Sequence, residues 1–320
     1  MTLLRCVALA ALAVSTAAWA QSFPNRTLRV IVPQPPGGGF DLVARVLAEG
    51  LAAELGQSVI VENRPGGGTV IGTDAVAKAE PDGHTLLLGA SANLVFSAGL
   101  YRNLPYDPKK DFAPLGLAAG FAYTMVARND LPQASLKEIV AFARANPGKL
   151  TYASAGNGSG QHMAAALLWH LAGVSVTHVP YKGAQAVYQD LIPGRVDLFF
   201  DASSTARGQV ESGRVRPIVV SPAARLPYHP AVPTVRETGV LDFEWETWAG
   251  YFVRSATPPA ALARLREAFA KMIASPEMAA ALEKRGVRPL RISGPEAEAL
   301  LASDLDKWTR LIRSAGISAD

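Results

Sequence analysis

The sequence has 320 residues, of which 49% are hydrophobic and 18% are charged, and its formal net charge is +4. This charge is mild and is spread along the chain without a basic block, so no nucleic-acid partner is expected. A chain of this length exceeds the size at which one hydrophobic core usually stays single, and two lobes are therefore predicted.

Residues 1–20 are predicted to be a signal peptide. Arg5 gives a positive start, residues 7–18 form an apolar stretch too short to span a bilayer, and Ala18-Trp19-Ala20 has the small-x-small form of a cleavage site. We expect export to the periplasm with cleavage after Ala20. No later apolar run approaches about 20 residues, so the exported protein is expected to be soluble. Because the only cysteine, Cys6, precedes the cleavage site, no disulfide or cysteine metal ligand is expected.

The first structural unit is a strand, a glycine loop and a helix. An apolar strand over residues 28–32 leads into the sequence PQPPGGGFD, which ends at Asp41. Apolar residues at helical spacing follow from Leu42, so Asp41 is placed to cap a helix. A helix N-terminus favours a carboxylate or phosphate, and Gly37, Gly38 and Gly39 let a ligand approach the main chain. The alternative is that these glycines serve only the geometry of the turn.

Two further strands follow in the same order. Residues 58–63 form a strand that enters a second loop, RPGGGT at 64–69, and a short helix runs to about Ala79. Residues 84–89 form a third strand, which ends in a polar stretch at 90–93 that contains Ser91. Strands that alternate with helices indicate a mainly parallel α/β sheet, in which ligands bind outside the carboxyl ends of the strands.

The middle of the chain predicts a second α/β lobe. Residues 112–128 form one long apolar stretch, which we interpret as a strand crossing between lobes, and a capping box at Ser135 and Glu138 then starts a helix. Strands at 150–154, 176–180, 196–200 and 216–221 follow, and Asp201 ends the third of these. A turn-rich segment leads back through residues 247–253, and three helices close the chain. We therefore predict lobe 1 over residues 21–119 and 248–320 and lobe 2 over residues 120–247.

A second glycine loop, AGNGSGQH, occupies residues 155–162 at the end of a strand and the start of a helix. It is not a phosphate loop, because no Gly-Lys-Ser/Thr follows its glycines. It is not a nucleophile elbow around Ser159 either, because Asn157 and Gln161 stand where that motif needs glycine. A neutral cradle of N–H and hydroxyl groups for a carboxylate fits the sequence. A purely structural turn is the alternative.

Other candidate groups have two readings each. His162, on the first turn after the loop, is placed either to hydrogen-bond a ligand or the loop, or to cap or pack. Asp201 is placed either to accept a hydrogen bond from a ligand or to hold a loop. The histidines at 84, 162, 170, 178 and 229 form no His-x-x-x-His or His-x-His pair, so no metal site is predicted. Neither a cofactor nor an enzyme activity is predicted, since no nucleophile stands with a recognisable base.

Several motifs together resemble one known family, the Bug-type substrate-binding receptors of tripartite tricarboxylate transporters. These are PxPPGGxxD at 33–41, ENRPGGG at 62–68, PDGHTLL at 81–87, GNGSGQH at 156–162, VPYKG at 179–183 and VDLFFD at 196–201. They cover nearly the whole mature chain in the expected order. One departure is Gln34, where an aromatic or small residue is common in the family, and it makes that wall of the site more polar.

The resemblance implies a two-lobed periplasmic binding protein of the Venus flytrap kind, similar to type II, which captures small carboxylates. It further implies that the ligand carboxylate is held between the two glycine loops, partly through ordered waters. The ligand-binding residues then implied or proposed are Pro35, Gly37, Gly38, Asp41, Ser91, Asn157, Gly158, Ser159, His162 and Asp201. The expected partners are a small carboxylate, such as a di- or tricarboxylate, an acidic amino acid or an aromatic acid, and the membrane subunits of the transporter. A monomer is expected, and the alternatives are a sensor that feeds a two-component system and an exported hydrolase.

Overall fold

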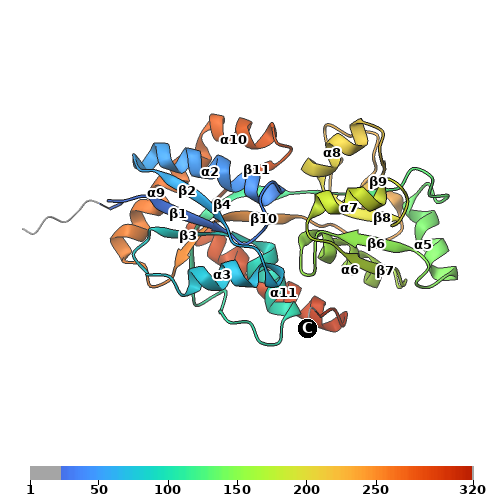
Figure 1. Cartoon of the computed structure of the whole chain (residues 1–320), viewed down its shortest axis with the longest axis horizontal. Coiled ribbons are helices and arrows are strands. Elements are labelled where there is room, and N and C mark those ends of the chain that lie inside the picture. Colours follow the sequence, from blue (N-terminus) through green and yellow to red (C-terminus); the bar gives the residue numbers. More distant parts are fainter. Residues whose placement is uncertain (1–22, 319–320) are drawn as a thin grey trace, which may run out of the picture.

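The computed structural model describes residues 23–318, in which two α/β lobes lie side by side (Figure 1). The predicted signal peptide and its cleavage after Ala20 lie outside the described residues. No helix within residues 23–318 is long and apolar enough to cross a membrane.

Lobe 1 is built on a six-stranded sheet with the order β11-β4-β10-β3-β1-β2. Its strands are β1 (Leu28–Val32), β2 (Val59–Asn63), β3 (Thr85–Ala90), β4 (Phe112–Phe121), β10 (Thr247–Arg254) and β11 (Arg288–Ser293). One face carries α2 (Gly39–Leu55), α9 (Pro259–Ala274) and α10 (Pro276–Glu283). The other carries α3 (Val70–Ala77), α11 (Gly294–Ser314) and the short helices η2 (Ser91–Phe96) and α4 (Ser97–Leu100). The loop before α3 contains a 3-10 turn, η1 (Gly67–Thr69).

Lobe 2 is built on a five-stranded sheet with the order β7-β6-β8-β5-β9. Its strands are β5 (Tyr123–Ala127), β6 (Thr151–Ser154), β7 (Thr177–Pro180), β8 (Leu198–Ala202) and β9 (Arg216–Val220). Helices α5 (Leu136–Ala145) and α6 (Gly160–Leu171) cover one face, and α7 (Ala184–Leu191) and α8 (Ser203–Glu211) cover the other. A 3-10 turn, η3 (Arg236–Thr238), lies in the segment that returns to lobe 1. One hydrophobic core runs through lobe 1 into the α5 and α6 side of lobe 2, and a smaller one lies under α7 and α8.

The two sheets share one pattern and are mixed. In lobe 1, β1 pairs in parallel with β2 and β3, whereas β10 is antiparallel to both β3 and β4. In lobe 2, β6 pairs in parallel with β7 and β8, whereas β5 is antiparallel to both β8 and β9. The prediction of mainly parallel sheets therefore holds for the βα units, but β10 and the edge strand β11 in lobe 1 and β5 in lobe 2 run the other way.

The chain passes between the lobes at two adjacent places. It leaves β4 at Phe121, the last residue paired in the six-stranded sheet, and enters β5 at Tyr123, and it returns between β9 and β10. Ser221 joins the two crossings, because its Oγ accepts the Tyr123 N–H (2.9 Å) and donates to the Trp245 carbonyl. The two connections thus form one hydrogen-bonded hinge region.

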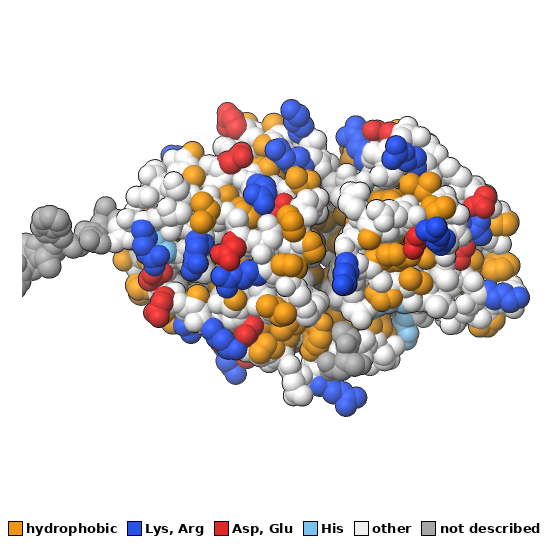
Figure 2. Space-filling model, in the orientation of Figure 1, with side chains coloured by type: hydrophobic (Ala, Val, Ile, Leu, Met, Phe, Trp, Pro, Cys, Tyr) orange, Lys and Arg blue, Asp and Glu red, His pale blue; other side chains and the backbone are white. Residues whose placement is uncertain are grey.

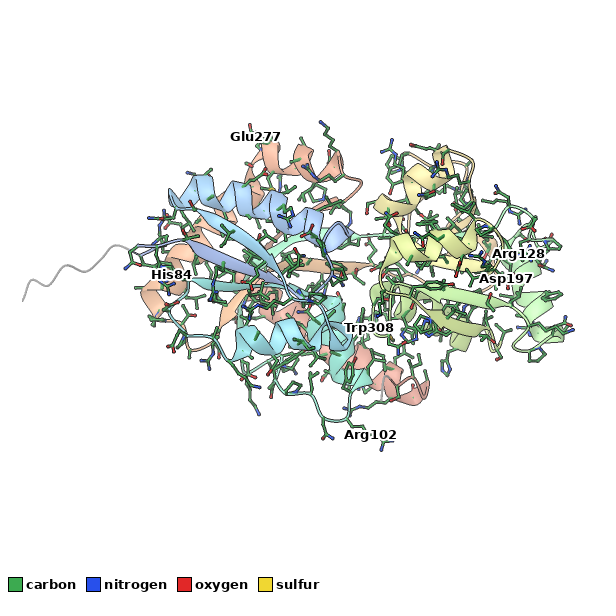
Figure 3. The ribbon with its side chains drawn as sticks, in the orientation of Figure 1. His84, Arg102, Arg128, Asp197, Glu277 and Trp308 are labelled. Atoms are coloured by element: carbon green, nitrogen blue, oxygen red, sulfur yellow. The ribbon has the colours of Figure 1, made fainter. Side chains whose placement is uncertain are left out.

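Some charged groups serve the scaffold far from the lobe boundary. Arg128 and Asp197, labelled at the outer end of lobe 2 in Figure 3, pair through Arg128 Nε and Asp197 Oδ1 at 2.9 Å. The other carboxylate oxygen accepts the Thr151 N–H (2.8 Å), so this pair joins β5, β8 and β6.

Candidate functional site

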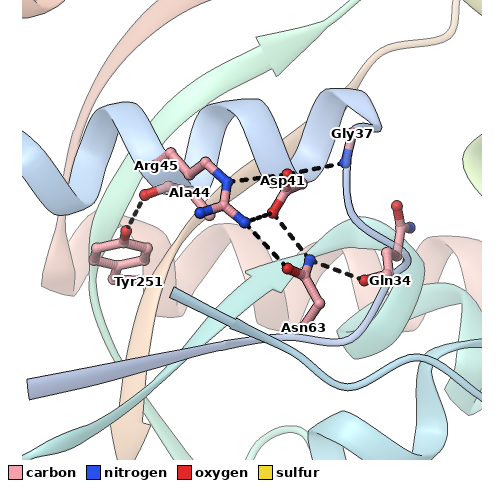
Figure 4. A network of polar contacts seen from close by, with 7 residues as sticks. All are labelled: Gln34, Gly37, Asp41, Ala44, Arg45, Asn63 and Tyr251. Carbon is pink, nitrogen blue, oxygen red and sulfur yellow. Dashed lines mark hydrogen bonds and ion pairs between the residues drawn. The ribbon is translucent and has the colours of Figure 1, made fainter. Parts of the chain in front are cut away.

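The first glycine loop connects β1 to α2, and Asp41 holds it in shape. The N-cap residue is Gly38, with no side-chain cap bond, so the prediction that Asp41 caps the helix is wrong. Asp41 lies on the first turn, and its carboxylate accepts the N–H of Gly37 (2.9 Å) and hydrogen bonds from Arg45 and Asn63 (Figure 4). Asn63 also donates to the Gln34 carbonyl (3.1 Å), so the network joins both ends of the loop to β2. Burial alone would raise the pKa of Asp41, but these hydrogen bonds hold the pKa below its usual value.

The beginning of α2 offers backbone donors that the protein itself does not use. Within residues 23–318 no hydrogen bond occupies the N–H groups of Gly39, Phe40 or Asp41, whereas the next, that of Leu42, donates to Gly38 O (3.0 Å). Such donors at a helix N-terminus attract an anion.

The second glycine loop, between β6 and α6, is held by Ser159 and His162. Ser159 is the N-cap, and its Oγ accepts the His162 N–H (3.2 Å) and donates to the Gly156 carbonyl (2.7 Å). His162 Nδ1 accepts the N–H of Gly158 (3.2 Å). In the described chain, the N–H groups of Gly160 and Gln161 donate no hydrogen bond. The start of α6 therefore repeats the arrangement at the start of α2.

His162 belongs to a stack of rings beside this loop. Its ring lies 4.2 Å from that of His178, which in turn stacks on Tyr152 at 4.8 Å between centroids. Burial lowers the pKa of His162 to about 3, with a further contribution from His178, and burial lowers the pKa of His178 to about 4. His162 is therefore neutral at neutral pH, and because Nδ1 accepts a hydrogen bond, its proton resides on Nε2.

Asp201 is fully buried at the end of β8 and has all its near partners inside lobe 2. Its carboxylate accepts hydrogen bonds from Gln161, Tyr188, Thr205 and the Ala202 N–H. Burial raises its pKa to about 6 despite these bonds. The Gln161 bond ties Asp201 to the first turn of α6, so Asp201 acts on the second glycine loop from behind.

Ser91 has a partner in the hinge region. Its stretch, expected as a polar loop, is the start of the buried helix η2, and Ser91 Oγ accepts the Trp248 N–H at 3.1 Å. This bond links the carboxyl end of β3 to the start of β10, directly after the second crossing.

Two hydroxyl groups that sequence reasoning missed lie at the lobe boundary. Thr69 Oγ1 and Ser204 Oγ are buried, and neither has a hydrogen-bond partner in the described part of the chain. Thr69 also has a φ of +89°, a strained conformation for a β-branched residue that is often associated with function. It lines a cavity of about 10 Å³ with residues that include Gln34, Phe40 and Asn93, which is room for about one water molecule. The positive φ has no signature in the sequence, so Thr69 was not predictable.

Both glycine loops lie where the lobes meet, and Figure 2 shows a furrow between the lobes. A Cβ atom added to Gly68 in lobe 1 would lie 3.0 Å from the Asn157 carbonyl oxygen in lobe 2. A Cβ atom added to Gly39 would lie 3.8 Å from Ser204 Oγ. The structure thus brings Gly68 in the loop before α3 against Asn157, and Gly39 at the start of α2 near Ser204, in a conformation with the lobes in contact.

A family model for the tripartite tricarboxylate transporter family receptor matches residues 43–317. The chain belongs to this family. A UPF0065 protein from Pseudomonas sp. is 38% identical over 93% of this chain and 89% of that protein. The resemblance to Bug-type receptors is confirmed, since the structure of periplasmic binding protein BugD has 32% identity and a TM-score of 0.85 over 92% of this chain and 99% of that one.

Two similar structures contain carboxylates. A protein from R. palustris solved with adipate has 30% identity and a TM-score of 0.86 over 92% of the receptor and 99% of that chain. MatC from Rhodopseudomonas palustris, with bound malate, has 31% identity and a TM-score of 0.84 over 91% and 100%. The receptor therefore has the two-lobed binding-protein fold. Like its family and these similar proteins, it is a solute-binding protein and not an enzyme.

The site has the chemistry of a neutral anion cradle. In the described chain, five N–H groups at the starts of α2 and α6 and the hydroxyls of Thr69 and Ser204 lack a hydrogen-bond partner, whereas Asp41, Asp201 and His162 are engaged within their own lobes. No group of three or more His, Cys, Asp or Glu side chains among residues 23–318 is arranged to hold a metal ion.

Proposed function

We propose that this receptor is exported to the periplasm, captures a small carboxylate between its lobes as a monomer, and delivers it to the membrane subunits of a tripartite tricarboxylate transporter. The observation that carries the proposal is the set of unpartnered N–H groups at the starts of α2 and α6. The adipate and malate in similar structures make dicarboxylates the first ligands to test.

We assign two kinds of role to the site residues. The N–H groups of Gly39 and Gly160 and their neighbours, together with Thr69 Oγ1, contact the carboxylate. Asp41 and Asp201 position the two helix starts from behind, because all of their short contacts lie within one lobe. Pro35, Gly37 and Gly38 shape the first loop, and Asn157, Gly158, Ser159 and His162 shape the second.

Such a cradle binds an anion without a formal positive charge. A helix N-terminus stabilises an anion by about 0.3–1 kcal/mol, or about 2 kcal/mol when partly buried, and each hydrogen bond to a charged group adds roughly 1.5–3 kcal/mol. Two helix starts, together with their hydrogen bonds to the anion, therefore supply a binding free energy of about 8 kcal/mol, which corresponds to micromolar affinity.

We further propose that lobe 1, predicted as 21–119 and 248–320, and lobe 2, predicted as 120–247, close on the ligand about the two crossings. Gly120, Phe121 and Thr247 pair in the six-stranded sheet and therefore move with lobe 1. The hydrogen bonds of Ser221 to both crossings support a single hinge.

Ligand identification and calorimetry test the proposal. Native mass spectrometry on protein purified without refolding identifies any retained carboxylate, and titration then compares the bound acid, or malate and adipate, with its amide. We expect the amide to bind at least tenfold more weakly, and Ser159→Ala, which frees the Gly156 carbonyl and the His162 N–H, to lose part of the same affinity. Equal affinities for acid and amide would refute the carboxylate cradle.

A further inference from the structure

A hollow on lobe 1 has a volume of about 760 Å³ and shares no lining residue with either glycine loop. One wall is the irregular segment between α4 and β4, where Figure 3 labels Arg102 at the lower edge of lobe 1. The other wall is a single face of α11, because Asp306, Thr309, Arg310 and Arg313 are spaced by three, four and seven positions. The hollow therefore lies outside the ligand cleft, on lobe 1.

The walls of this hollow are fixed in the folded chain. A Cβ atom added to Gly99 would lie 2.9 Å from a side-chain carbon of Ile312, so α4 and α11 are in close contact at one end. The Tyr106 hydroxyl donates to the Asn93 carbonyl (2.6 Å), and the Asp111 carboxylate accepts the Asp107 N–H (2.7 Å). A site that is already formed loses little ordering entropy when a partner binds.

Four cations, Arg102, Lys109, Arg310 and Arg313, and three carboxylates, Asp107, Asp111 and Asp306, line the hollow, so its lining carries one excess positive charge. Asp107 is engaged by the N–H groups of Lys109 and Lys110 and by an ion pair with Lys110 (3.3 Å). By contrast, no ion pair within residues 23–318 involves Lys109, Arg310 or Arg313.

The two arginines are nevertheless held in place. Arg310 Nε donates to the Asp306 carbonyl (2.9 Å), and Arg313 donates to the Ala98 carbonyl (3.4 Å). These bonds orient the guanidinium groups and leave further N–H donors on each. Fixed guanidinium groups with free donors are well suited to carboxylates.

We propose that this hollow is a docking site for an acidic segment of a partner protein. The cations lie on both walls of an open hollow, so carboxylates spaced along a peptide reach both walls, whereas one small anion contacts a single wall. Resting on the proposed function, the partner is a membrane subunit of the transporter, which must hold the receptor without blocking its ligand cleft.

A binding experiment with a matched control tests this docking site. The probe is a fluorescein-labelled hexaglutamate peptide, titrated at physiological salt with the full mature receptor. The test variant is Arg310→Glu with Arg313→Glu. The control is Lys137→Glu with Lys149→Glu, which makes the same change in net charge on lobe 2, at two exposed lysines outside any ion pair of the described chain.

We expect one peptide per receptor, at least tenfold weaker binding to the test variant, and control binding within twofold of the original. Equal losses in the two variants would show general charge attraction and overturn the proposal, as would no binding at all. Displacement of the peptide by free glutamate at the same carboxylate concentration would also overturn it, in favour of a small-anion site. Arg310→Gln with Arg313→Gln repeats the test should the charge reversals not fold.

Titration of malate and adipate into the same variants separates this inference from the proposed function. Unchanged carboxylate affinity with lost peptide binding supports the docking site. Peptide binding by a receptor that takes up no carboxylate would refute the proposed function and leave the acidic docking site standing.

Discussion

His162 and His178 stack beside the second glycine loop, and each contacts a group that shapes it. His162 accepts the Gly158 N–H, and His178 Nε2 is 2.7 Å from Ser154 Oγ, which in turn bonds to Gly156. Both rings are kept neutral by burial. Protonation of either ring places a charge in a buried stack, so the loop depends on the neutral forms.

We predict that stability falls as the pH drops from about 6.5 toward 4, and that His178→Gln reduces this fall. The folded pKa of His178, about 4, is below its unfolded value, so between these values the unfolded state binds the extra proton and is favoured by acid. Glutamine keeps a polar group near Ser154 without titrating, so the slope should decrease by at most about 1.4 kcal/mol per pH unit. Urea unfolding between pH 4 and 8 measures it.

Asp201 also titrates in this pH range, so the test compares the slope of the original protein with that of His178→Gln. Its pKa is raised to about 6 by burial, so its contribution to stability is present at low pH and is lost as the pH rises through 6, opposite in sign to the histidines. This contribution is common to both proteins and cancels in the difference. Identical slopes for the original and His178→Gln would contradict the neutral stack.

At the scale of residues, the sequence predicted the two glycine loops better than it predicted the partners of the side chains beside them. Both glycine loops follow from local signals, namely a strand, glycines and a helix start. The partners of Asp41, however, include Asn63, and those of Asp201 include Tyr188, both of which become neighbours only in the folded sheet. Whether a carboxylate faces a ligand or a loop is therefore decided by tertiary contacts.

At the scale of elements, one buried hydroxyl pair connects the crossings. Tyr123, at the start of β5, and Thr247, at the start of β10, are hydrogen-bonded through their side-chain oxygens at 2.9 Å. A Cβ atom added to Gly160 would lie 2.0 Å from the Tyr123 hydroxyl oxygen, so the pair also borders the start of α6. It bridges the lobes directly beside the second glycine loop.

We predict that Tyr123→Phe and Thr247→Val each destabilise the fold by about 1–3 kcal/mol, because each leaves one buried hydroxyl without a partner. The double variant removes both groups and should cost less than the sum, with a coupling of about 1 kcal/mol. Chemical denaturation of all four proteins completes the cycle. Additive losses would mean that the hydrogen bond does not stabilise the hinge.

The elements that the sequence missed lack the usual patterns. Helix α8 (SSTARGQVE) buries only Ser203 and Ala206, so it has no apolar stripe to reveal it. Strand β11 contains Pro289 and two arginines, which a strand tolerates at the edge of a sheet, where β11 lies. By contrast, the last helix was predictable, because the Ser293 and Glu296 capping box stands in the sequence and is present in the structure.

At the scale of the whole molecule, the lobes touch through their glycine loops. Gly68 lies against the Asn157 carbonyl, and Gly158 lies against Leu100, where an added Cβ atom would be 3.1 Å from a side-chain carbon. Contacts made only when the lobes are together stabilise the closed state relative to an open one. Ligand binding and these contacts should therefore reinforce each other, and small-angle scattering should show compaction when the ligand is added.

Gly68→Ala should weaken closure, and Gly56→Ala is its matched control. Both glycines have left-handed backbones, with φ of +59° and +65°, so alanine costs about 1–2 kcal/mol of stability at either position. Only at Gly68 does the new methyl group meet another lobe, 3.0 Å from the Asn157 carbonyl, and there it also crowds the Tyr101 hydroxyl of lobe 1, whereas at Gly56 nothing lies within 4 Å. We expect both variants to lose stability, Gly68→Ala more because of the Tyr101 contact, but weaker ligand binding and less compaction only in Gly68→Ala, measured by calorimetry and by the radius of gyration with and without ligand. If both variants bind and compact alike, the loop contact does not contribute to closure. An unchanged radius of the original protein at ligand saturation would count against a hinged closure altogether.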